Sequence, residues 1–448
     1  MNIILLSGGS GKRLWPLSND IRSKQFIKLF KTEQNEYESM IQRIYRQVKL
    51  VDEDAEITIA TAKSQVSSII NQLGDNIGIS VEPCRKDTFP AIALAGMYLH
   101  DIKKIPDDET VVVCPVDPYV NDEYFEALKE LDIIVQDTDT NLVLMGIEPT
   151  YPSEKYGYII PKTRDKFSDV EMFREKPDAK TAQLYISNGA LWNSGVFAFK
   201  LKYIVNKAHQ LMEFRNYQDL YDKYQLQEKI SFDYAVAEKE KYIKVMRFTG
   251  KWKDLGTWNT LTEEMSNCIL GKGILDETCE NTNIINELNI PILCMGLKDM
   301  VVAASNEGIL VSNKEQSSYI KPFVDSIDQQ IMFAEKSWGY YRVIDYTSNS
   351  ITVKVTLHRN CNMNYHSHEY RDEVWTVVSG EGTAVIDSKK VALRPGVVVN
   401  LPCFCRHTVI AKTKLEIIEI QMGEGITVHD KKKYEYDYNN IINEWGRN

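Results

Sequence analysis

Residues 1 to about 260 alternate between short, continuously apolar runs and longer amphipathic stretches. The apolar runs are NIILLS, AEITIAT, ETVVVCPVD and NLVLMGIE, and the stretches between them include FPAIALAGMYLHDIKK and EYFEALKELDIIVQD. Apolar, β-rich runs separated by helices indicate a mainly parallel sheet that is covered on both faces. Ligands of such sheets bind at the carboxyl ends of strands. The pattern therefore predicts an α/β fold whose site lies in the loops that follow strands.

Two later regions change character. Short apolar runs such as NTNIINE and MVVAASNEGILVSN recur between polar turns from about residue 262, and no helix is expected there before KPFVDSIDQQI. Strand-like runs separated by turn residues then dominate from about residue 331: YYRVID, SITVKVTL, EVWTVVSG, EGTAVID, VVVNLP and KLEIIEIQ. Their spacing is typical of a sandwich or small barrel. We expect three domains, over 1–261, 262–330 and 331–448.

Composition excludes several classes of protein. The 448 residues are 43% hydrophobic and carry a net charge of −10, with no long basic tract, which argues against a nucleic-acid partner. No run of about 18 apolar residues is present, so neither a membrane span nor a membrane partner is expected. The first apolar run meets a glycine turn at once and has no signal-peptide cleavage site. The eight cysteines are scattered and contain no CxxC pair, which predicts reduced thiols and a cytoplasmic protein.

A glycine-rich turn, LLSGGSGKRLWPLS, directly follows the first apolar run. It is not a Walker A loop, because Leu6 and Arg13 stand where that motif needs glycine and Ser or Thr. It is not a dinucleotide-binding turn either, because Leu14 takes the place of the last glycine. A turn of this kind can still donate backbone N–H groups to phosphate oxygens, with Arg13 and Lys24 neutralising the charge. The turn therefore predicts phosphate binding.

The stretch GGSGKRLWPLS followed by SKQF resembles the sugar-1-phosphate nucleotidyltransferases, and most closely the mannose-1-phosphate guanylyltransferase family, which usually reads GGSGTRLWPLSR and PKQF. Six more segments resemble this family in the same order: EPCRKDTFPAIALA, VCPVDPYV, GIEPTYPSEKYGYI, FREKPD, WNSGVFAF and WKDLGTWNTL. The resemblance implies a Rossmann-like nucleotidyltransferase domain with a mixed, mainly parallel sheet. It also implies transfer of a nucleotidyl group from GTP to mannose 1-phosphate, with release of pyrophosphate.

The resemblance assigns roles to named residues. Two anions must meet in this reaction, so catalysis rests on charge neutralisation and alignment. The catalytic residues are expected to be Arg13, Lys24, Asp117 and Asp254, with Mg²⁺ held by the two aspartates. Those expected to bind the nucleotide are Gly8, Gly9, Gly11, Lys12, Glu82, Arg85 and Asp87. Those expected to bind the sugar phosphate are Gly157, Glu175, Lys176 and Asn193.

The chain departs from the family at the segment that reads the base. RNTAP is replaced by RKDTFP, PSDH by PVDP, and SKQF lacks the leading proline. A related nucleotidyltransferase with another base or sugar 1-phosphate therefore stays open. So does a non-catalytic sensor of sugar phosphates, although a sensor has no need of the complete set of triphosphate and metal residues.

The last strand-rich region contains MNYHSHEYRDEVWTVVSGEG and, later, LPCFCRH. His366 and His368 alternate, so on a strand both point to one side. Together with Glu373 and His407 they resemble the metal site of cupin barrels, and three imidazoles with a carboxylate suit a divalent transition metal such as Zn²⁺. The neighbouring CxC pair, Cys403 and Cys405, is interpreted as alternate residues on one strand.

This region also resembles the type II mannose-6-phosphate isomerase domain that is fused to many of these guanylyltransferases. That family reads QxHxHRxExW, whereas NYHSHEYRDEVW has two additional residues between His368 and Arg371 and no Gln before the first His. A cupin barrel is expected, and interconversion of mannose 6-phosphate and fructose 6-phosphate is a hypothesis. The connector and the barrel edges are compatible with a homodimer.

Overall fold

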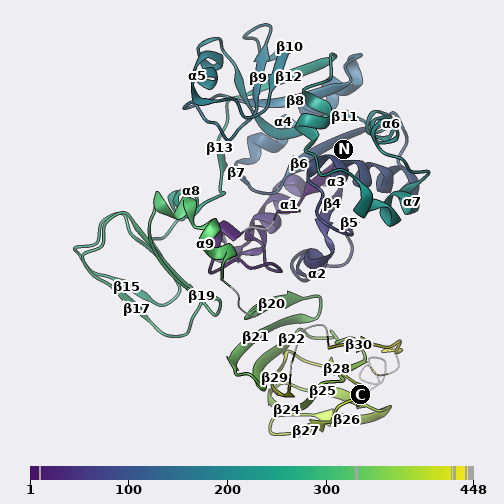
Figure 1. Ribbon diagram of the computed structural model, residues 1–448, viewed down its shortest axis with the longest axis vertical. Coiled ribbons are helices and arrows are strands. Elements are labelled where there is room, and N and C mark those ends of the chain that lie inside the picture. Colours follow the sequence, from purple (N-terminus) through teal and green to yellow (C-terminus); the bar gives the residue numbers. More distant parts are fainter. Residues whose placement is uncertain (10–11, 328–330, 425, 427–429, 439–440, 442–448) are drawn as a thin grey trace. The chain divides into compact units, whose positions relative to one another are not determined.

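The structure, a computed structural model, describes residues 1–448 apart from 10–11, 328–330, 425, 427–429, 439–440 and 442–448 (Figure 1). The chain divides into two compact units. The first contains Met1–Ser10, Lys24–Val66 and Asn76–Ser266, and the second contains Gly11–Ser23, Ser67–Asp75 and Asn267–Asn448. Among the described residues, no helix is both long and apolar enough to cross a bilayer.

The first unit is built on a nine-stranded mixed sheet. In spatial order its strands are β5 (Gly78–Glu82), β4 (Glu56–Ala62), β1 (Asn2–Leu6), β6 (Thr110–Pro115), β11 (Leu191–Lys200), β8 (Leu142–Ile147), β12 (Ile243–Phe248), β10 (Phe167–Arg174) and β9 (Tyr158–Pro161). β1 runs parallel to β4 and β6, whereas β11 is antiparallel to β6 and β8. The loops after β1 and β6 therefore emerge side by side at one edge of the sheet.

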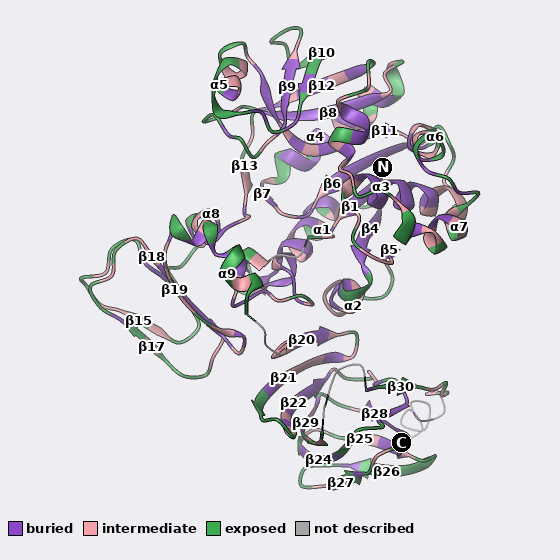
Figure 2. Cartoon of the chain, in the orientation of Figure 1, coloured by how far each residue is buried: buried purple, intermediate pink, exposed green. Residues whose placement is uncertain are grey.

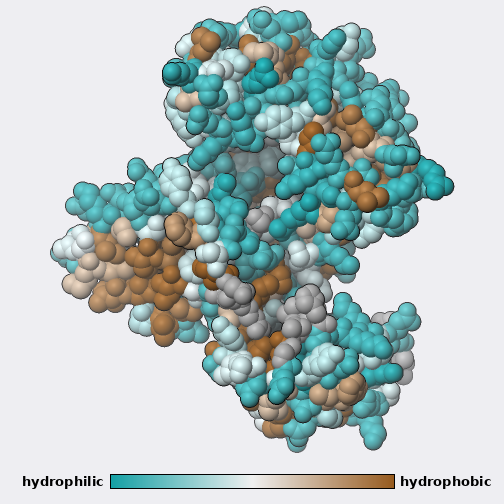
Figure 3. Space-filling view, in the orientation of Figure 1, coloured by the Kyte–Doolittle hydropathy of each residue, from teal (hydrophilic) through white to brown (hydrophobic). Residues whose placement is uncertain are grey.

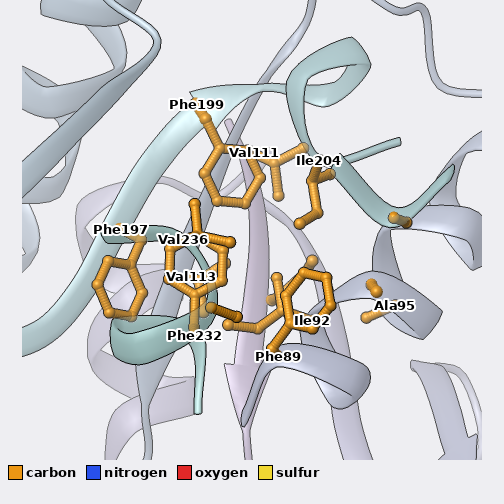
Figure 4. Packing of buried hydrophobic residues seen from close by; sticks show 14 of the residues in the cluster. Phe89, Ile92, Ala95, Val111, Val113, Phe197, Phe199, Ile204, Phe232 and Val236 are labelled. Atoms are coloured by element: carbon orange, nitrogen blue, oxygen red, sulfur yellow. The ribbon is translucent and has the colours of Figure 1, made fainter. Parts of the chain in front are cut away.

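Helices cover both faces of this sheet. The helices of the first unit are α1 (Met40–Val51), α3 (Thr88–Met97), α4 (Asp122–Asp137), α5 (Ala179–Ser187), α6 (Leu201–Leu211), α7 (Tyr217–Asp222) and α8 (Trp258–Glu263), whereas α2 (Val66–Leu73) belongs, apart from Val66, to the second unit. Val111 and Val113 of β6 face the cluster formed with α3 and α6, where Phe197, Phe199 and Phe232 also pack (Figure 4). α4 also packs on β6. The buried residues line both sides of the central strands (Figure 2).

The second unit begins with two small sheets. One has the order β14 (Ile269–Leu270), β16 (Asn283–Asn286), β18 (Met300–Ser305) and β19 (Gly308–Asn313), and the other pairs β15 (Gly273–Leu275) with β17 (Ile292–Cys294). The expected β-rich connector is thus confirmed. The helix expected in KPFVDSIDQQI covers only the first part of this segment, because α9 spans Lys321–Asp325. Residues 328–330 lie outside the described part.

Residues 12–23, which follow the glycine turn in sequence, pack within this second unit. The Ser305 hydroxyl donates to the Pro16 carbonyl over 2.6 Å, and Asn19 Nδ2 donates to Glu307 Oε1 over 2.7 Å. The buried Arg22 guanidinium pairs with Glu287 at 2.8 Å. Its charge is therefore compensated within the same unit, as a buried cation requires.

Two further sheets form the end of the second unit. One has the order β20 (Phe333–Lys336), β21 (Gly339–Tyr346), β22 (Ser350–Leu357), β29 (Leu415–Gly423), β24 (Arg371–Ser379) and β27 (Val398–Leu401). The other has the order β26 (Lys389–Leu393), β25 (Gly382–Ile386), β28 (His407–Ala411), β23 (His366–Ser367) and β30 (Lys432–Lys433). Their inner residues share one core that includes Val355, Trp375 and Val409.

These elements confirm the predicted fold class, an α/β domain followed by a β-rich connector and a cupin-type β region. The described chain divides into two compact units, whereas three domains were expected. The domain boundaries expected at residues 261 and 330 stay predictions. One local expectation was wrong. Cys403 lies in a turn that ends before β28 begins at His407, and Phe404 has a φ of 65°, so the CxC pair is not on a strand.

Candidate functional site

A pocket opens where β1, β5 and β6 end. The predicted nucleotide-binding residues that line it are Gly8, Gly9, Glu82, Arg85 and Asp87, together with Lys24 and Asp117. A Cβ atom at Gly8 would lie 3.3 Å from Glu82 Oε1, so a larger residue there would press on this carboxylate. The Asp87 carboxylate accepts the Thr88 N–H at 2.8 Å and caps α3, with a φ of 77°. The glycine turn and the EPCRKDT segment therefore form one pocket.

Lys24 lies between the two aspartates that were predicted to bind metal. Its Nζ is 3.0 Å from Asp117 Oδ2 and 4.0 Å from Asp254 Oδ1. The aspartates come together because β13 (Trp252–Asp254) pairs with β7 (Pro118–Val120), with Asp254 opposite Pro118. Desolvation opposes ionisation of Asp117, but the charge and hydrogen bond of Lys24 outweigh it and hold the pKa of Asp117 below its ordinary value.

The residues at this position fit a divalent cation. Two carboxylates already converge on one ammonium group, and carboxylate oxygens are the protein ligands that Mg²⁺ prefers. Asp117 and Asp254 would hold the ion, which would supply charge neutralisation to the phosphate groups.

A second pocket shares Pro115 and Asp117 with the first. Gly157, Glu175, Asn193 and Asp254 line it. A Cβ atom on Gly157 would lie 2.5 Å from Glu175 Oε2, so only glycine leaves this carboxylate in place. Asn193 N–H donates to the Gly157 carbonyl over 2.8 Å, which fixes the two strands side by side. The pocket therefore presents carboxylate and amide groups of the kind that bind sugar hydroxyls.

Asp233 also lines the second pocket, and the sequence analysis missed it. Asn193 Nδ2 donates to Asp233 Oδ1 over 2.7 Å. Burial raises the pKa of Asp233 to about 7, and the charge of Glu175 adds to this. No motif that we compared contains ISFDYAV, so the only signal was an acidic residue in an otherwise apolar segment.

Other predicted residues are placed elsewhere. Lys12 forms ion pairs with Asp20 at 3.2 Å and Asp325 at 3.4 Å, within the second unit. Arg13 is exposed on the short helix Lys12–Leu14, also in that unit, and Gly11 lies outside the described residues. Lys176 pairs with Glu175 Oε1 at 2.7 Å. Roles for these four residues in substrate binding stay predictions.

The four residues of the expected cupin site do meet. β23 lies beside β28 with His366 opposite His407, and ligand nitrogens of His366, His368 and His407 lie within 4.8 Å of one another. Glu373 on β24 approaches His368 Nε2 at 3.1 Å and His407 Nε2 at 3.4 Å. All four side chains are at most 3% exposed.

The hydrogen bonds of the imidazoles fit a metal. The Nδ1 atom of each imidazole faces a backbone carbonyl. His366 Nδ1 lies 2.6 Å from the Asn364 carbonyl, His407 Nδ1 lies 3.0 Å from the Cys405 carbonyl, and His368 Nδ1 faces the Asp430 carbonyl. Each Nδ1 therefore carries the proton, and each Nε2 lone pair points inward. Lone pairs that face a carboxylate repel it unless a cation lies between them. His407 Nε2 is buried and makes no hydrogen bond among the described residues.

The difference between this chain and the isomerase motif QxHxHRxExW can also be described by substitutions, without an insertion. If Arg371, Glu373 and Trp375 keep the register of RxExW, no residue is added, His366 takes the place of the Gln and Tyr370 takes the place of the second His. In either register His366 belongs to the histidine cluster, and Tyr370 is 59% exposed. The expectation of two additional residues between His368 and Arg371 stays a prediction.

The pocket beside these histidines combines charged and apolar groups. Lys336, Arg371, Glu419 and Gln421 line it with Trp338 and several aliphatic side chains. Arg371 Nε donates to Glu373 Oε1 over 2.9 Å, so one cation already contacts the metal-binding carboxylate. An anionic, partly apolar ligand would suit this lining.

The raised pKa of Asp233 predicts a pH-dependent effect on stability. Between about pH 4 and pH 7 the folded chain keeps this proton while the unfolded chain loses it, so stability falls as pH rises through this range. Asp233→Asn removes this loss and should stabilise the protein by about 1–3 kcal/mol more at pH 8 than at pH 4. Urea unfolding, followed by tryptophan fluorescence, measures the difference. The exposed Asp165→Asn is the control, and parallel curves for Asp233→Asn and the wild type would contradict the assignment.

Known proteins resemble both units. The family model for nucleotidyl transferases matches residues 2–269, and that for the mannose-6-phosphate isomerase C-terminal domain matches residues 325–436. The xanthan biosynthesis protein XanB of Xanthomonas campestris pv. campestris is 28% identical, over 97% of this chain and 98% of its own. A putative mannose-1-phosphate guanylyltransferase of Vibrio cholerae is 29% identical, over 96% of this chain and 99% of its own.

A solved structure, described as mannose-1-phosphate geranyltransferase from Thermus thermophilus, is 26% identical with a TM-score of 0.61. It matches 72% of this chain and 98% of that chain. Because the nucleotidyl transferase model covers more than half of the sequence, the resemblance inferred from the glycine turn and its companion motifs is confirmed, and the chain belongs to the nucleotidyl transferase family.

Proposed function

We propose that the first unit transfers a guanylyl group from GTP to mannose 1-phosphate, giving GDP-mannose and pyrophosphate. The observation that carries this proposal is the meeting of the two pockets at Asp117, beside Lys24 and Asp254. A phosphate oxygen of the sugar phosphate attacks the α-phosphorus, the bond from that phosphorus to the bridging oxygen breaks, and pyrophosphate leaves. Lys24 lowers the repulsion between the two anions, and relatives named mannose-1-phosphate guanylyltransferase support the substrates.

The nucleotide pocket supports guanine as the base. Glu82 is 4% exposed and lines this pocket. Guanine presents two N–H donors on its Watson–Crick edge, whereas adenine presents an acceptor at N1, so a carboxylate favours guanine. In the altered RKDTFP segment, Asp87 lines the same pocket and its carboxylate accepts the Thr88 N–H at the start of α3.

Pyrophosphate release should identify the substrates directly. We expect turnover with Mg²⁺, GTP and mannose 1-phosphate to exceed that with other nucleoside triphosphates and sugar 1-phosphates. A different best pair would show a related nucleotidyltransferase, and no turnover with any pair would favour the non-catalytic sensor.

The carboxylate cluster gives a site-specific prediction. Asp254→Asn should lower turnover by more than about 100-fold, because it removes one of the two carboxylates that would hold the Mg²⁺ beside the reacting phosphates. The exposed Asp137→Asn at the end of α4 is the matched control. An active Asp254→Asn variant with an unchanged requirement for Mg²⁺ would refute the role of Asp254.

We also propose that the cupin unit binds a divalent transition metal such as Zn²⁺ and interconverts mannose 6-phosphate and fructose 6-phosphate. His366, His368, His407 and Glu373 would hold the ion, which polarises sugar oxygens when bound. Isomerisation moves a proton from C2 to C1 and another from O2 to O1. Lys336 and Arg371 line the adjoining pocket and would attract the phosphate.

Metal analysis tests this second site. Protein supplied with Zn²⁺ and then dialysed should retain about one ion per chain and interconvert the two hexose phosphates, whereas His407→Ala should lose most of the metal. His209→Ala, at an exposed position of α6, is the control. Retained metal without interconversion would remove the isomerase proposal alone, and equal metal in His407→Ala would remove the site.

We propose a homodimer formed through the connector. Six apolar side chains there are each between 57% and 64% exposed: Ile274, Ile290, Leu293, Met295, Ile309 and Val311. Ile274 lies opposite Leu293 in the β15–β17 pair, and Ile309 and Val311 share one side of the edge strand β19. Figure 3 shows an apolar patch over these elements.

This surface, which we call the connector face, suits a second copy of the chain. Its six side chains are each more than half exposed and would form the apolar centre of a standard interface, in which each partner buries about 800 Å². The chain carries a net charge of −10, so copies repel one another except where an uncharged face can pair with itself.

A cytoplasmic location is proposed as well, because all eight cysteines are free.

Sedimentation should detect this dimer. Wild-type protein at micromolar concentration should sediment as a dimer, and Leu293→Lys should shift it to a monomer, because a charge in the connector face loses its hydration on association. Leu226→Lys, exposed in the first unit, should leave the dimer intact. A wild-type monomer, or a dimer that survives Leu293→Lys, would contradict the proposal.

A further inference from the structure

A tyrosine outside every recognised motif contacts the carboxylate that faces the base. Tyr224 begins the short helix Tyr224–Leu226, after α7, and it is fully buried in the core of the first unit. Its hydroxyl donates to Glu82 Oε2 over 2.7 Å. Glu82 ends β5, so the hydrogen bond joins the edge of the sheet to a helical segment far along the chain.

The two oxygens of Glu82 have different surroundings. Oε2 accepts the Tyr224 hydroxyl, whereas Oε1 is the atom nearest to Gly8, at 3.3 Å from the position of a Cβ there. Gly8, Glu82 and Arg85 all line the nucleotide pocket. Tyr224 therefore holds one oxygen toward the core and leaves the other facing the glycine turn.

We propose that Tyr224 is a positioning residue for base selection: it orients Glu82 so that the carboxylate accepts the N1–H and 2-amino groups of guanine. This inference rests on the proposed function, since it needs a guanine nucleotide in this pocket. Adenine offers an acceptor at N1 and no 2-amino group, and hypoxanthine keeps N1–H but lacks the amino group. A buried carboxylate left without these donors disfavours both analogues.

The charge of Glu82 depends on the same hydrogen bond. Burial raises the pKa of Glu82, and the Tyr224 hydroxyl works against this by favouring the ionised form. Arg85 and the Lys86 N–H act in the same direction as Tyr224, whereas Asp87 raises the pKa further. Removing the hydroxyl should therefore raise the pKa of Glu82, and a protonated carboxyl accepts fewer hydrogen bonds from guanine.

Nucleotide discrimination tests the proposal. We would measure kcat and KM for GTP, ITP and ATP with mannose 1-phosphate in the wild type, in Tyr224→Phe and in the control Tyr221→Phe on α7. The wild type should prefer GTP to ITP by about 10- to 100-fold. Tyr224→Phe should raise KM for GTP about 10-fold, with a small change in kcat, and should bring the GTP/ITP ratio close to one. Its KM for mannose 1-phosphate should not change.

Two further readouts separate positioning from a general structural effect. The loss of kcat/KM for GTP in Tyr224→Phe should be larger at pH 6 than at pH 8, because of the raised pKa of Glu82. In a Glu82→Gln background the same substitution should have little additional effect, since a residue that acts through Glu82 cannot act without it. Glu82→Gln alone should also lower the preference for GTP, and it tests the arrangement even if Tyr224→Phe is unstable.

The outcomes distinguish this inference from the proposed function. A wild type that turns over no guanine nucleotide would overturn both. A wild type that uses GTP, with an unchanged GTP/ITP ratio in both Tyr224→Phe and Glu82→Gln, would overturn the role of Tyr224 and Glu82 only. Equal rises in KM for GTP and for mannose 1-phosphate would show a structural effect and would also overturn it.

Discussion

The Lys24 ammonium lies between two carboxylates at the point where the nucleotide and sugar pockets meet, 3.0 Å from Asp117 and 4.0 Å from Asp254. The reaction that we propose must bring two anions together, and this cation is the group that lowers their repulsion. The neighbouring strands place these groups: β1 and β6 end beside Lys24, and the pairing of β7 with β13 puts Asp254 opposite Pro118. A change in that pairing would separate the two carboxylates.

Residues from separate sequence motifs come together in the structure. Gly8 and Glu82 were both expected at the nucleotide, and the structure places them in one pocket, because parallel strands end at the same edge. The residues that the sequence analysis missed, Asp233 and Tyr224, form hydrogen bonds with distant partners, Asn193 and Glu82. A single sequence contains no record of such contacts, so no periodicity or spacing could have found them.

In the second unit, some residue placements were predicted from the sequence and others were not. Alternation predicted His366 and His368 on one side of a strand. β23 ends at Ser367, but the two imidazoles still meet, and His407 joins them through a strand pairing that spacing alone does not define. The packing of residues 12–23 within this unit was not expected, because the motif GGSGKRLWPLS reads as one continuous loop. Its anchors, Glu287, Ser305 and Glu307, have no sequence signature that separates them from other polar residues.

Equilibrium binding of the product tests most directly the central claim, that two pockets meet at Asp117 and hold the two parts of one nucleotide-sugar. Radiolabelled GDP-mannose would be dialysed against the protein in the presence of Mg²⁺ and increasing concentrations of each substrate alone. The account predicts that GTP and mannose 1-phosphate each displace the product completely and competitively, because the product occupies both pockets. GDP-mannose that stays bound at saturating mannose 1-phosphate would contradict it.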